Sequence, residues 1–430
     1  MILLRLALIF ACLLASCAVA VAAPRKAALS AREVSVPLNI RLREANLRFG
    51  FRLLSELTEE AQPREGNILI SPLSVEIALG LLLPGASDPV RREIASTIEW
   101  RDQELDQASE ALALLSEQFR TDEPRIQLTL ANVLWAQGSA ADLSQRFSGL
   151  ALPRPGANVL IANLQNSTTA IDLNRQLSLG TSGQIDRVLD RERPQTRSRV
   201  LVNAATFRAP WRQAFNPVET SEVPFTLSDG KQKTVQRMGM TGSFRYFEGR
   251  DFQAVNLPFG RNSEWSMIVF LPAAGTTLTA FEDDLSDERW QLWMQQFALR
   301  DGAVYLPQLR LRYGSGLSRA LKALGMVNAF SAGTSFPGLG TALDEVSHQT
   351  AFEAREDGLE PPLPTGDTKQ RPLSIVNPAQ SPSARSERRR RAPFVFNVDR
   401  PFFFAIYNNY SGFVLFLGSV VDPTETTNSG

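Results

Sequence analysis

Apolar positions follow two different periods along the chain. Between residues 40 and 58 they recur every three or four residues, at Leu42, Ala45, Phe49, Leu53 and Leu57. This spacing puts them on one face and predicts an amphipathic helix. Residues 88–119, which are acidic or mixed in character, also predict helices.

Later segments are shorter, richer in β-branched and aromatic residues, and bounded by turn residues. They predict strands at 126–136 and 199–207 and several strands within 222–272. A last pair, 402–407 and 412–420, is joined by Asn-Asn-Tyr-Ser, which favours a hairpin. Helices come first and strands dominate later, without an internal repeat, which predicts the α+β class rather than alternating βαβ units.

Residues 1–22 have the pattern of a secretory signal peptide. Arg5 is followed by an apolar run and then by small residues that suit a signal peptidase, and the run breaks at Pro24. Since no later stretch approaches ~18 uninterrupted apolar residues, we expect a secreted, extracellular protein without a membrane span. The stretch Leu14–Cys17 also resembles a bacterial lipoprotein box, which leaders rich in small residues produce by chance.

The only two cysteines, Cys12 and Cys17, lie in this leader. The mature chain is therefore expected to contain neither disulfides nor thiol chemistry, and to depend on a large hydrophobic core. Asn166 and Asn409 each begin an Asn-x-Ser/Thr triplet, so both are candidate glycosylation sites of a secreted glycoprotein.

Charge and chemistry-bearing residues exclude several functions. Lys+Arg and Asp+Glu are both 45, so the overall charge does not predict nucleic-acid binding. The single histidine, His348, lies in an apolar segment without a Gly-x-Ser-x-Gly motif, and metal sites built on His or Cys are excluded by count. With no phosphate-binding loop either, we expect no enzyme activity, no metal and no cofactor.

One region has a composition unlike a compact core. Residues 358–393 hold seven prolines and an arginine-rich run from Arg385 to Arg391, with no aromatic residue. This composition predicts a solvated, extended loop with local polyproline character.

Four segments share a pattern with a known family. In order they are Asn67–Leu79, Leu201–Phe207 followed by Trp211 and Phe215, Phe396–Ile406, and Gly412–Pro423. Their succession resembles the serpin family of serine protease inhibitors. The resemblance runs from about residue 38 to residue 423, which we take as a single domain, followed by a short tail at 424–430.

The resemblance implies a serpin fold, with three β-sheets, about nine helices and an exposed reactive loop at 356–394 in a monomer. In inhibitory members, a target protease attacks the loop and becomes acylated, and the loop then inserts as a central strand of the main sheet. The residues that match the family's sheet-opening cluster are Ser71, Ser74, Asn203 and His348. Trp211 corresponds to the position at which insertion starts. All five also have a simpler interpretation as ordinary core residues.

The hinge of the loop departs from the family pattern. Glu356 and Gly358 have the family spacing from His348, but Leu359 and the prolines Pro361, Pro362 and Pro364 replace the expected small residues. A central strand needs every N–H, which proline lacks. Three unmet carbonyl partners cost on the order of 1–3 kcal/mol each, so we expect this hinge to stay outside the sheet.

The attacked bond has two candidate positions. Counting forward from the hinge puts it near Pro372–Leu373, whereas counting back from the C-terminal signature puts it at Arg390, Arg391 or Ala392. The two counts differ by about 18 residues, which indicates an insertion of roughly 60 Å of extended chain.

The arginine run suits trypsin-like or furin-like serine proteases, whose acidic pockets accept arginine. Three interpretations of this run stay open: a substrate or maturation site, bait for an inhibited protease, and a solvated loop or polyanion contact. The proline hinge and the longer loop favour a non-inhibitory or substrate-like protein. The alternative is a working suicide-substrate inhibitor of such proteases.

Overall fold

The computed structural model describes residues 25–61, 66–118, 120–136, 159–162, 175, 199–331, 333, 335–337, 342–360 and 392–425. Eight α-helices lie in this described part, where about nine were expected for the whole chain. They are α1 (Arg25–Glu60), α2 (Pro72–Gly80), α3 (Asp88–Thr97), α4 (Asp102–Asp106), α5 (Ala108–Glu117), α8 (Leu278–Glu282), α9 (Asp287–Gln296) and α10 (Ser318–Ala323). Short 3₁₀ helices span Leu83–Gly85 and Asn328–Phe330.

The main sheet has six strands, which unite segments far apart in sequence. Their spatial order is β10 (Leu309–Gly316), β11 (Glu345–Ala354), β12 (Gly358–Glu360), β4 (Arg199–Pro210), β2 (Gln127–Ala136) and β3 (Val159–Ala162). Beyond the end of β12, strands β11 and β4 pair directly and in parallel, from Glu345 opposite Val200 to Ala351 opposite Thr206. In the centre of this sheet, β11 and β4 are therefore neighbours over most of their length, and the short strand β12 separates them at one end.

The other strands form one continuous sheet of nine. Its order is β1 (Ile68–Ile70), β15 (Val414–Val420), β14 (Phe402–Asn408), β8 (Trp265–Pro272), β7 (Phe252–Pro258), β6 (Gln232–Glu248), β9 (Ala298–Pro307) and β13 (Phe394–Asn397), with β5 (Asn216–Thr226) paired to β6. The 17-residue strand β6 pairs with β5 at its beginning and with β7 at its end. It thereby joins two of the three expected sheets by hydrogen bonds.

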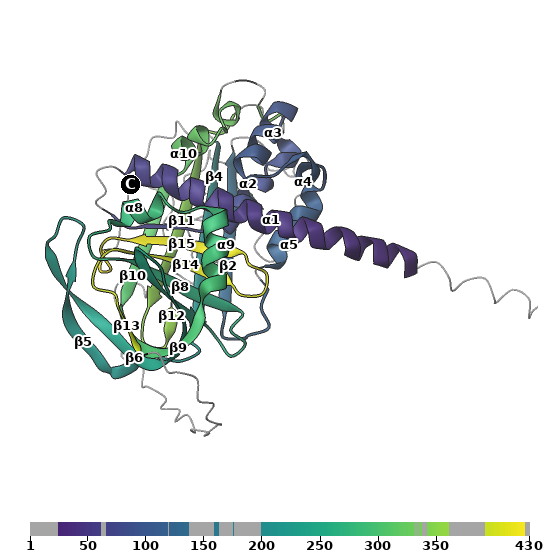
Figure 1. The fold of residues 1–430 in the computed structure, drawn as a ribbon. Helices are drawn as coiled ribbons and strands as arrows, with labels where there is room; N and C mark the ends of the chain where they lie inside the picture. Colours follow the sequence, from purple (N-terminus) through teal and green to yellow (C-terminus); the bar gives the residue numbers. More distant parts are fainter. Residues whose placement is uncertain are drawn as a thin grey trace, which may run out of the picture.

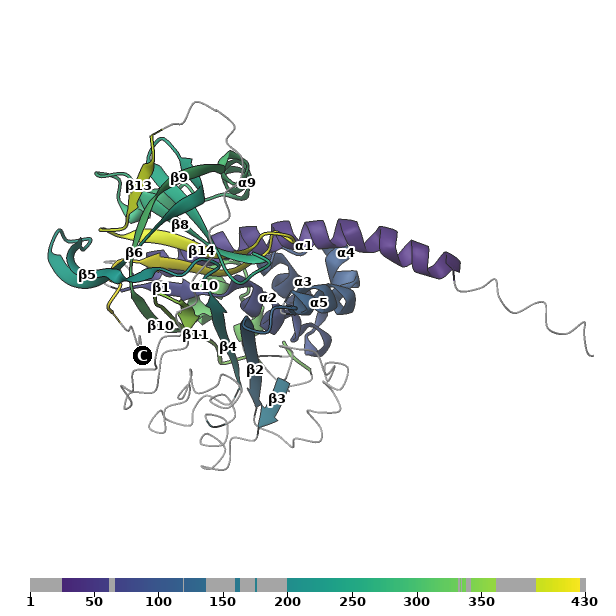
Figure 2. The ribbon, with the colours of Figure 1, turned by 90° about the horizontal axis from the view of Figure 1, so that it is seen from below.

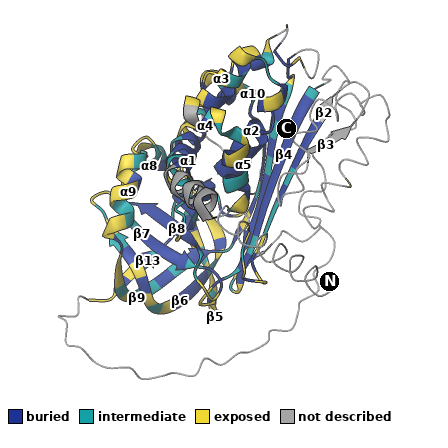
Figure 3. Ribbon diagram, turned by 90° about the vertical axis from the view of Figure 1, so that its right-hand side faces the viewer, coloured by how far each residue is buried: buried dark blue, intermediate teal, exposed yellow. Residues whose placement is uncertain are grey.

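Helix α2 lies in the interior. Ser71 precedes it in an extended conformation, Pro72 occupies its first turn, and all nine of its residues are buried. Proline is tolerated there because the first N–H groups of a helix have no partner within the helix. Figure 3 shows buried strands β4 and β8 on either side of the helices, whereas α9 and β5 are largely exposed.

Helix α1 is longer than its predicted core of 40–58. It runs across the molecule, and its N-terminal turns project away from the rest of the fold (Figures 1 and 2). The predicted apolar face from Leu42 to Leu57 is buried, in agreement with its helical spacing. The predicted strands at 126–136, 199–207, 402–407 and 412–420 are also present, within a residue or a few of their expected limits.

Candidate functional site

A row of buried polar side chains crosses the centre of the main sheet. Asn132 on β2 lies opposite Asn203 on β4, and Asn203 lies opposite His348 on β11. The Asn203 amide donates to Asn132 Oδ1 at 2.6 Å and to Ser74 Oγ at 2.7 Å. All of these residues are fully buried, so the structure brings the expected residues Ser74, Asn203 and His348 together.

The contacts of His348 define its tautomer. Its Nε2 atom accepts a hydrogen bond of 3.0 Å from the Ser71 backbone N–H, so this nitrogen carries no proton. Its Nδ1 atom lies 2.6 Å from Asn203 Oδ1, an acceptor, and therefore carries the proton of the neutral ring. Burial lowers the pKa of His348 to about 3. Both ring nitrogens are occupied by structural contacts, so the ring is not arranged as a general base.

The polar row shows how Ser71 takes part and adds two residues. Ser71 contributes its backbone N–H to His348, and its hydroxyl has no partner in the described part of the chain. Asn132, and Thr350, which donates to Leu69 O at 2.6 Å, were missing from the expected cluster. The available signal for Asn132 was its place as the one polar residue between Leu130 and Ala136 of the predicted strand.

Trp211 follows the end of β4 and holds the turn that begins the hinge. Its indole N–H donates to Arg355 O at 2.8 Å, and its backbone N–H donates to Asp357 O at 3.0 Å. Its ring is stacked on Phe259, with centroids 4.6 Å apart. The structure thus places Trp211 beside the hinge; its role at the start of insertion stays a prediction.

Glu356 is held on the other side of the same turn. Its Oε1 atom accepts hydrogen bonds from Thr220 Oγ1 at 2.7 Å and from Gln308 Nε2 at 2.9 Å, while its carbonyl accepts from the Phe215 N–H. The Arg355 N–H donates to Gly358 O at 2.9 Å and closes a tight reversal of the chain. These contacts return the chain from β11 toward the gap between β11 and β4.

The expectation that the hinge stays outside the sheet is wrong for its first residues. Gly358–Glu360 form strand β12, which pairs with β11 on one side and with β4 on the other. These three residues precede the first proline, so their N–H groups are available to a sheet. The proline argument therefore applies from Pro361 onward.

Two residues explain why β12 fits at this place. The Leu359 side chain is fully buried and therefore anchors the strand in the core. A Cβ atom on Gly358 would lie 2.3 Å from Ala209 O, so only glycine permits this close approach of the two backbones. The family spacing had marked Gly358, but its contact with Ala209 was not visible in the sequence.

Several expected site residues lie outside the described residues. They are Pro361, Pro362, Pro364, Pro372, Leu373, Arg390, Arg391 and the sequon residue Asn166. Ala392 and Pro393 are described and exposed, and they lead into β13.

Asn409 is exposed, as a glycosylation site requires, but its side-chain nitrogen is already in use. Nδ2 donates to Ser263 O at 2.7 Å and to Ser266 Oγ at 2.6 Å. A glycan on this nitrogen would replace one of the two donated hydrogens. Glycosylation at Asn409 stays a prediction, and it would require this loop to rearrange.

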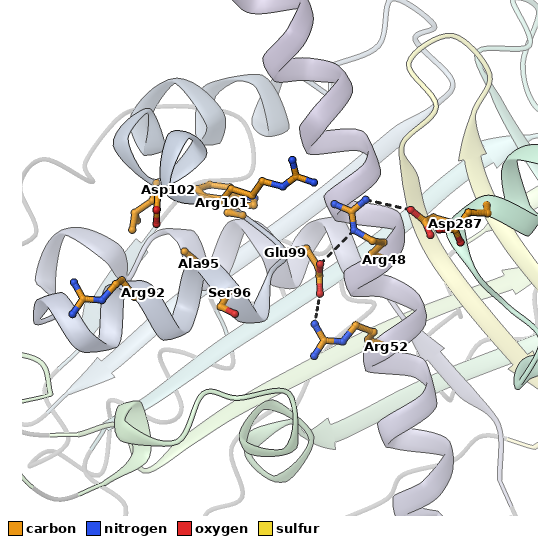
Figure 4. Close-up of a pocket in the computed structure, with 12 residues that line it drawn as sticks. Arg48, Arg52, Arg92, Ala95, Ser96, Glu99, Arg101, Asp102 and Asp287 are labelled. Carbon is orange, nitrogen blue, oxygen red and sulfur yellow. Dashed lines mark hydrogen bonds and ion pairs between the residues drawn. The ribbon is translucent and has the colours of Figure 1, made fainter.

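A surface pocket lies between α1, the end of α3 and the beginning of α9 (Figure 4). Arg48 binds Glu99 at 3.3 Å and Asp287 at 3.2 Å, and Arg52 also pairs with Glu99. The arginines that line the pocket (Arg48, Arg52, Arg92 and Arg101) are matched by as many carboxylates (Glu99, Asp102, Asp287 and Glu288). The balanced charge fits a structural ion-pair network better than a site for an anion.

Neither a metal centre nor a membrane helix is present in the described part of the chain. No three His, Cys, Asp or Glu side chains are grouped there as metal ligands would be. No described helix is both long and apolar enough to cross a bilayer.

The fold and the hinge define a class of protein in which the start of a loop, here Gly358–Glu360, forms a strand of the main sheet. Comparison with known families identifies the same class. The model of the family "Serpin (serine protease inhibitor)" matches residues 44–423. The chain therefore belongs to the serpin family.

Relatives within this family have diverse printed names. Neuroserpin of Gallus gallus is 26% identical over 86% of this chain and 89% of its own length. Leukocyte elastase inhibitor of Xenopus laevis is 27% identical over 89% of this chain and 99% of its own. The solved structure of human thyroxine-binding globulin in complex with thyroxine has a TM-score of 0.73 and 20% identity and covers 90% of this chain and all of its own. The same fold is thus found in a protein named as an inhibitor and in a protein that binds a small molecule.

Proposed function

We propose that this chain is a secreted, monomeric serpin that presents its arginine-rich loop to serine proteases of basic specificity and is cut by them as a substrate. The protein is not itself an enzyme, since its histidine serves the main sheet. The leader sequence supports secretion, and the run from Arg388 to Arg391 supports recognition by proteases with an acidic specificity pocket.

The observation that carries the proposal is the place where β12 ends. Its last residue, Glu360, directly precedes Pro361. If the register of β12 is continued, Pro361 comes to lie between Phe352 and Phe207, and Pro362 between Ala351 and Thr206. Insertion therefore meets two consecutive prolines immediately beyond the part that is already inserted.

Further insertion also has to break existing hydrogen bonds. Ala351 and Thr206 form the uppermost pair of the direct pairing between β11 and β4. An ordinary hinge residue would replace each broken bond with one of its own, but a proline offers no donor. Each unmet carbonyl costs on the order of 1–3 kcal/mol, so cleavage at the arginines is not followed by full insertion.

A suicide-inhibitor function remains the second candidate, because one feature of the hinge favours it. β12 is already inserted, with Leu359 buried between β4 and β11. The start of insertion is therefore compatible with this sheet, and the question is whether the strand can extend past Pro361.

The experiment is incubation of the mature protein with trypsin or furin, followed by denaturing electrophoresis and a thermal melt. The proposal expects a cleaved chain without an SDS-resistant complex, and only a small change in the melting temperature after cleavage. A covalent complex at near-unit stoichiometry would establish the inhibitor instead. A large increase in melting temperature would show that the cleaved loop inserts despite its prolines.

A further inference from the structure

The C-terminal root of the loop is held by an aromatic side chain. Phe394 begins β13, is almost fully buried, and stacks on Tyr246 with ring centroids 4.0 Å apart and an interplanar angle of 14°. Phe244 meets the same ring edge-on at 6.2 Å. Phe394 pairs with Gly302 of β9, where an added Cβ atom would lie 2.4 Å from the phenylalanine ring. The ring thus occupies a space that only glycine leaves open.

Arg300 covers this stack and reaches the loop itself. Its guanidinium carbon lies 4.9 Å from the centre of the Tyr246 ring and 5.9 Å from that of Phe394. One terminal nitrogen lies 3.4 Å from Glu248 Oε2, and the other donates to Ala392 O at 3.4 Å. We call Tyr246, Phe394 and Arg300 the aromatic clasp.

An extended peptide is recognised through its main-chain groups, with alternate side chains in pockets, so we expect a serine protease to need the chain free on both sides of the cleaved bond. For a cut at Arg391–Ala392, the residues after the bond are Ala392, Pro393 and Phe394. The aromatic clasp holds the carbonyl group of Ala392 and the ring of Phe394. For a cut at Arg390–Arg391, the first three residues after the bond end at Pro393, so the ring of Phe394 lies outside them.

We propose that the aromatic clasp determines which arginine bond a protease can use, by excluding Arg391–Ala392 and directing cleavage to the bonds before Arg391. Arg300 is the positioning residue of this device. This inference rests on the proposed presentation of the arginine run to proteases. The sequence alone favours the opposite result for a protease that reads several basic residues together, since Arg391–Ala392 is the bond that follows the complete run of four arginines.

The test is limited digestion of the mature protein with trypsin, stopped when only a small fraction is cut. Mass spectrometry of the C-terminal fragment then identifies its first residue. The wild-type fragment is expected to begin at Arg389, Arg390 or Arg391, and rarely at Ala392. In Arg300→Ala, the share of fragments that begin at Ala392 is expected to increase about tenfold, because cleavage of a locally opened segment follows the population of the open form.

Arg237→Ala is the matched control. Arg237 contacts the other end of β13 in the same manner, with its guanidinium carbon 4.7 Å from the centre of the Tyr305 ring and a 3.1 Å hydrogen bond to Asn397 Oδ1. It is expected to keep the wild-type fragment pattern. Melting curves of the uncut variants show that both are folded before digestion.

Two results would overturn the clasp: wild-type fragments that begin mainly at Ala392, or the same change of pattern in both variants. An SDS-resistant complex would overturn the substrate-like function instead. The clasp would still be tested in that case, since formation of the acyl enzyme releases the C-terminal side of the loop with the same new first residue.

Discussion

The buried carboxyl group of Glu76 gives the sharpest prediction about this fold. Glu76 lies on α2 and is fully buried. It accepts a hydrogen bond of 2.8 Å from the Trp100 indole N–H and one of 3.3 Å from Asn46 Nδ2, while Asn46 in turn accepts from the Val414 N–H. Its partners in this contact set are neutral, so burial dominates and raises the pKa of Glu76 to about 8.

The direction of the pH effect follows from this increase. Below pH 4.5, the ordinary pKa of the group, Glu76 is protonated in both the folded and the unfolded chain. Between there and pH 8 the unfolded chain loses the proton while the folded chain keeps it, so the free energy of unfolding decreases as the pH increases. From pH 5 to pH 8 the decrease due to Glu76 amounts to about 3 kcal/mol.

The perturbation is Glu76→Gln, which keeps the shape of the side chain and removes its titration. Urea denaturation at pH 5, 6, 7 and 8, followed by tryptophan fluorescence, gives the free energy of unfolding of both proteins. We expect the stability of wild type relative to the variant to decrease by about 3 kcal/mol over this range. Glu110→Gln, at an exposed position of α5, is the control for the effect of replacing an exposed carboxyl group with an amide. Parallel pH profiles for wild type and Glu76→Gln would refute a protonated buried carboxyl group.

Three further predictions concern the main sheet. Gly358→Ala places a Cβ atom 2.3 Å from Ala209 O, so β12 should leave the sheet and its amide protons should lose protection in hydrogen exchange; unchanged protection would contradict the steric argument. His348→Ala leaves the Ser71 N–H without its partner and takes one contact from Asn203 Oδ1, so it should destabilise the protein by about 3–5 kcal/mol in urea at pH 7; since the pKa of His348 is lowered from 6.5 to about 3 by folding, the wild type should gain stability between pH 5 and 6.5, and the variant should lack this gain. Replacing the three prolines from Pro361 to Pro364 with alanine should restore up to three strand donors, so the melting temperature after trypsin cleavage should increase well above that of cleaved wild type; equal values would remove the prolines as the obstacle.

The local sequence pattern was sufficient for most of the elements and much of the core. The helical spacing from Leu42 to Leu57 identified the buried face of α1, and the β-rich runs identified β2, β4, β14 and β15. These features depend on neighbours a few residues away, so period and turn chemistry are enough to predict them. The identity of the polar row was also accessible, because Ser74, Asn203 and His348 match segments of a family pattern.

Only the tertiary structure decided the state of the hinge. The prolines made an excluded hinge reasonable, yet Gly358–Glu360 are inserted, because Leu359 finds a buried position and Gly358 finds a backbone that it alone can approach. The hinge strand β12 lies between β11 and β4, and the local sequence does not bring these two strands together. β4 precedes the hinge by about 150 residues.

Contacts between segments that are far apart in sequence also explain the neutral His348 tautomer, the protonated Glu76 and the aromatic clasp. Each is defined by groups from two or more elements that meet only in the folded chain, such as Arg300, Tyr246 and Phe394 from three separate strands. Residue types and spacing therefore determined which elements form and which polar residues lie inside. Their pKa values, their hydrogen-bond partners and the extent of insertion depend on distances that exist only after the sheets have assembled.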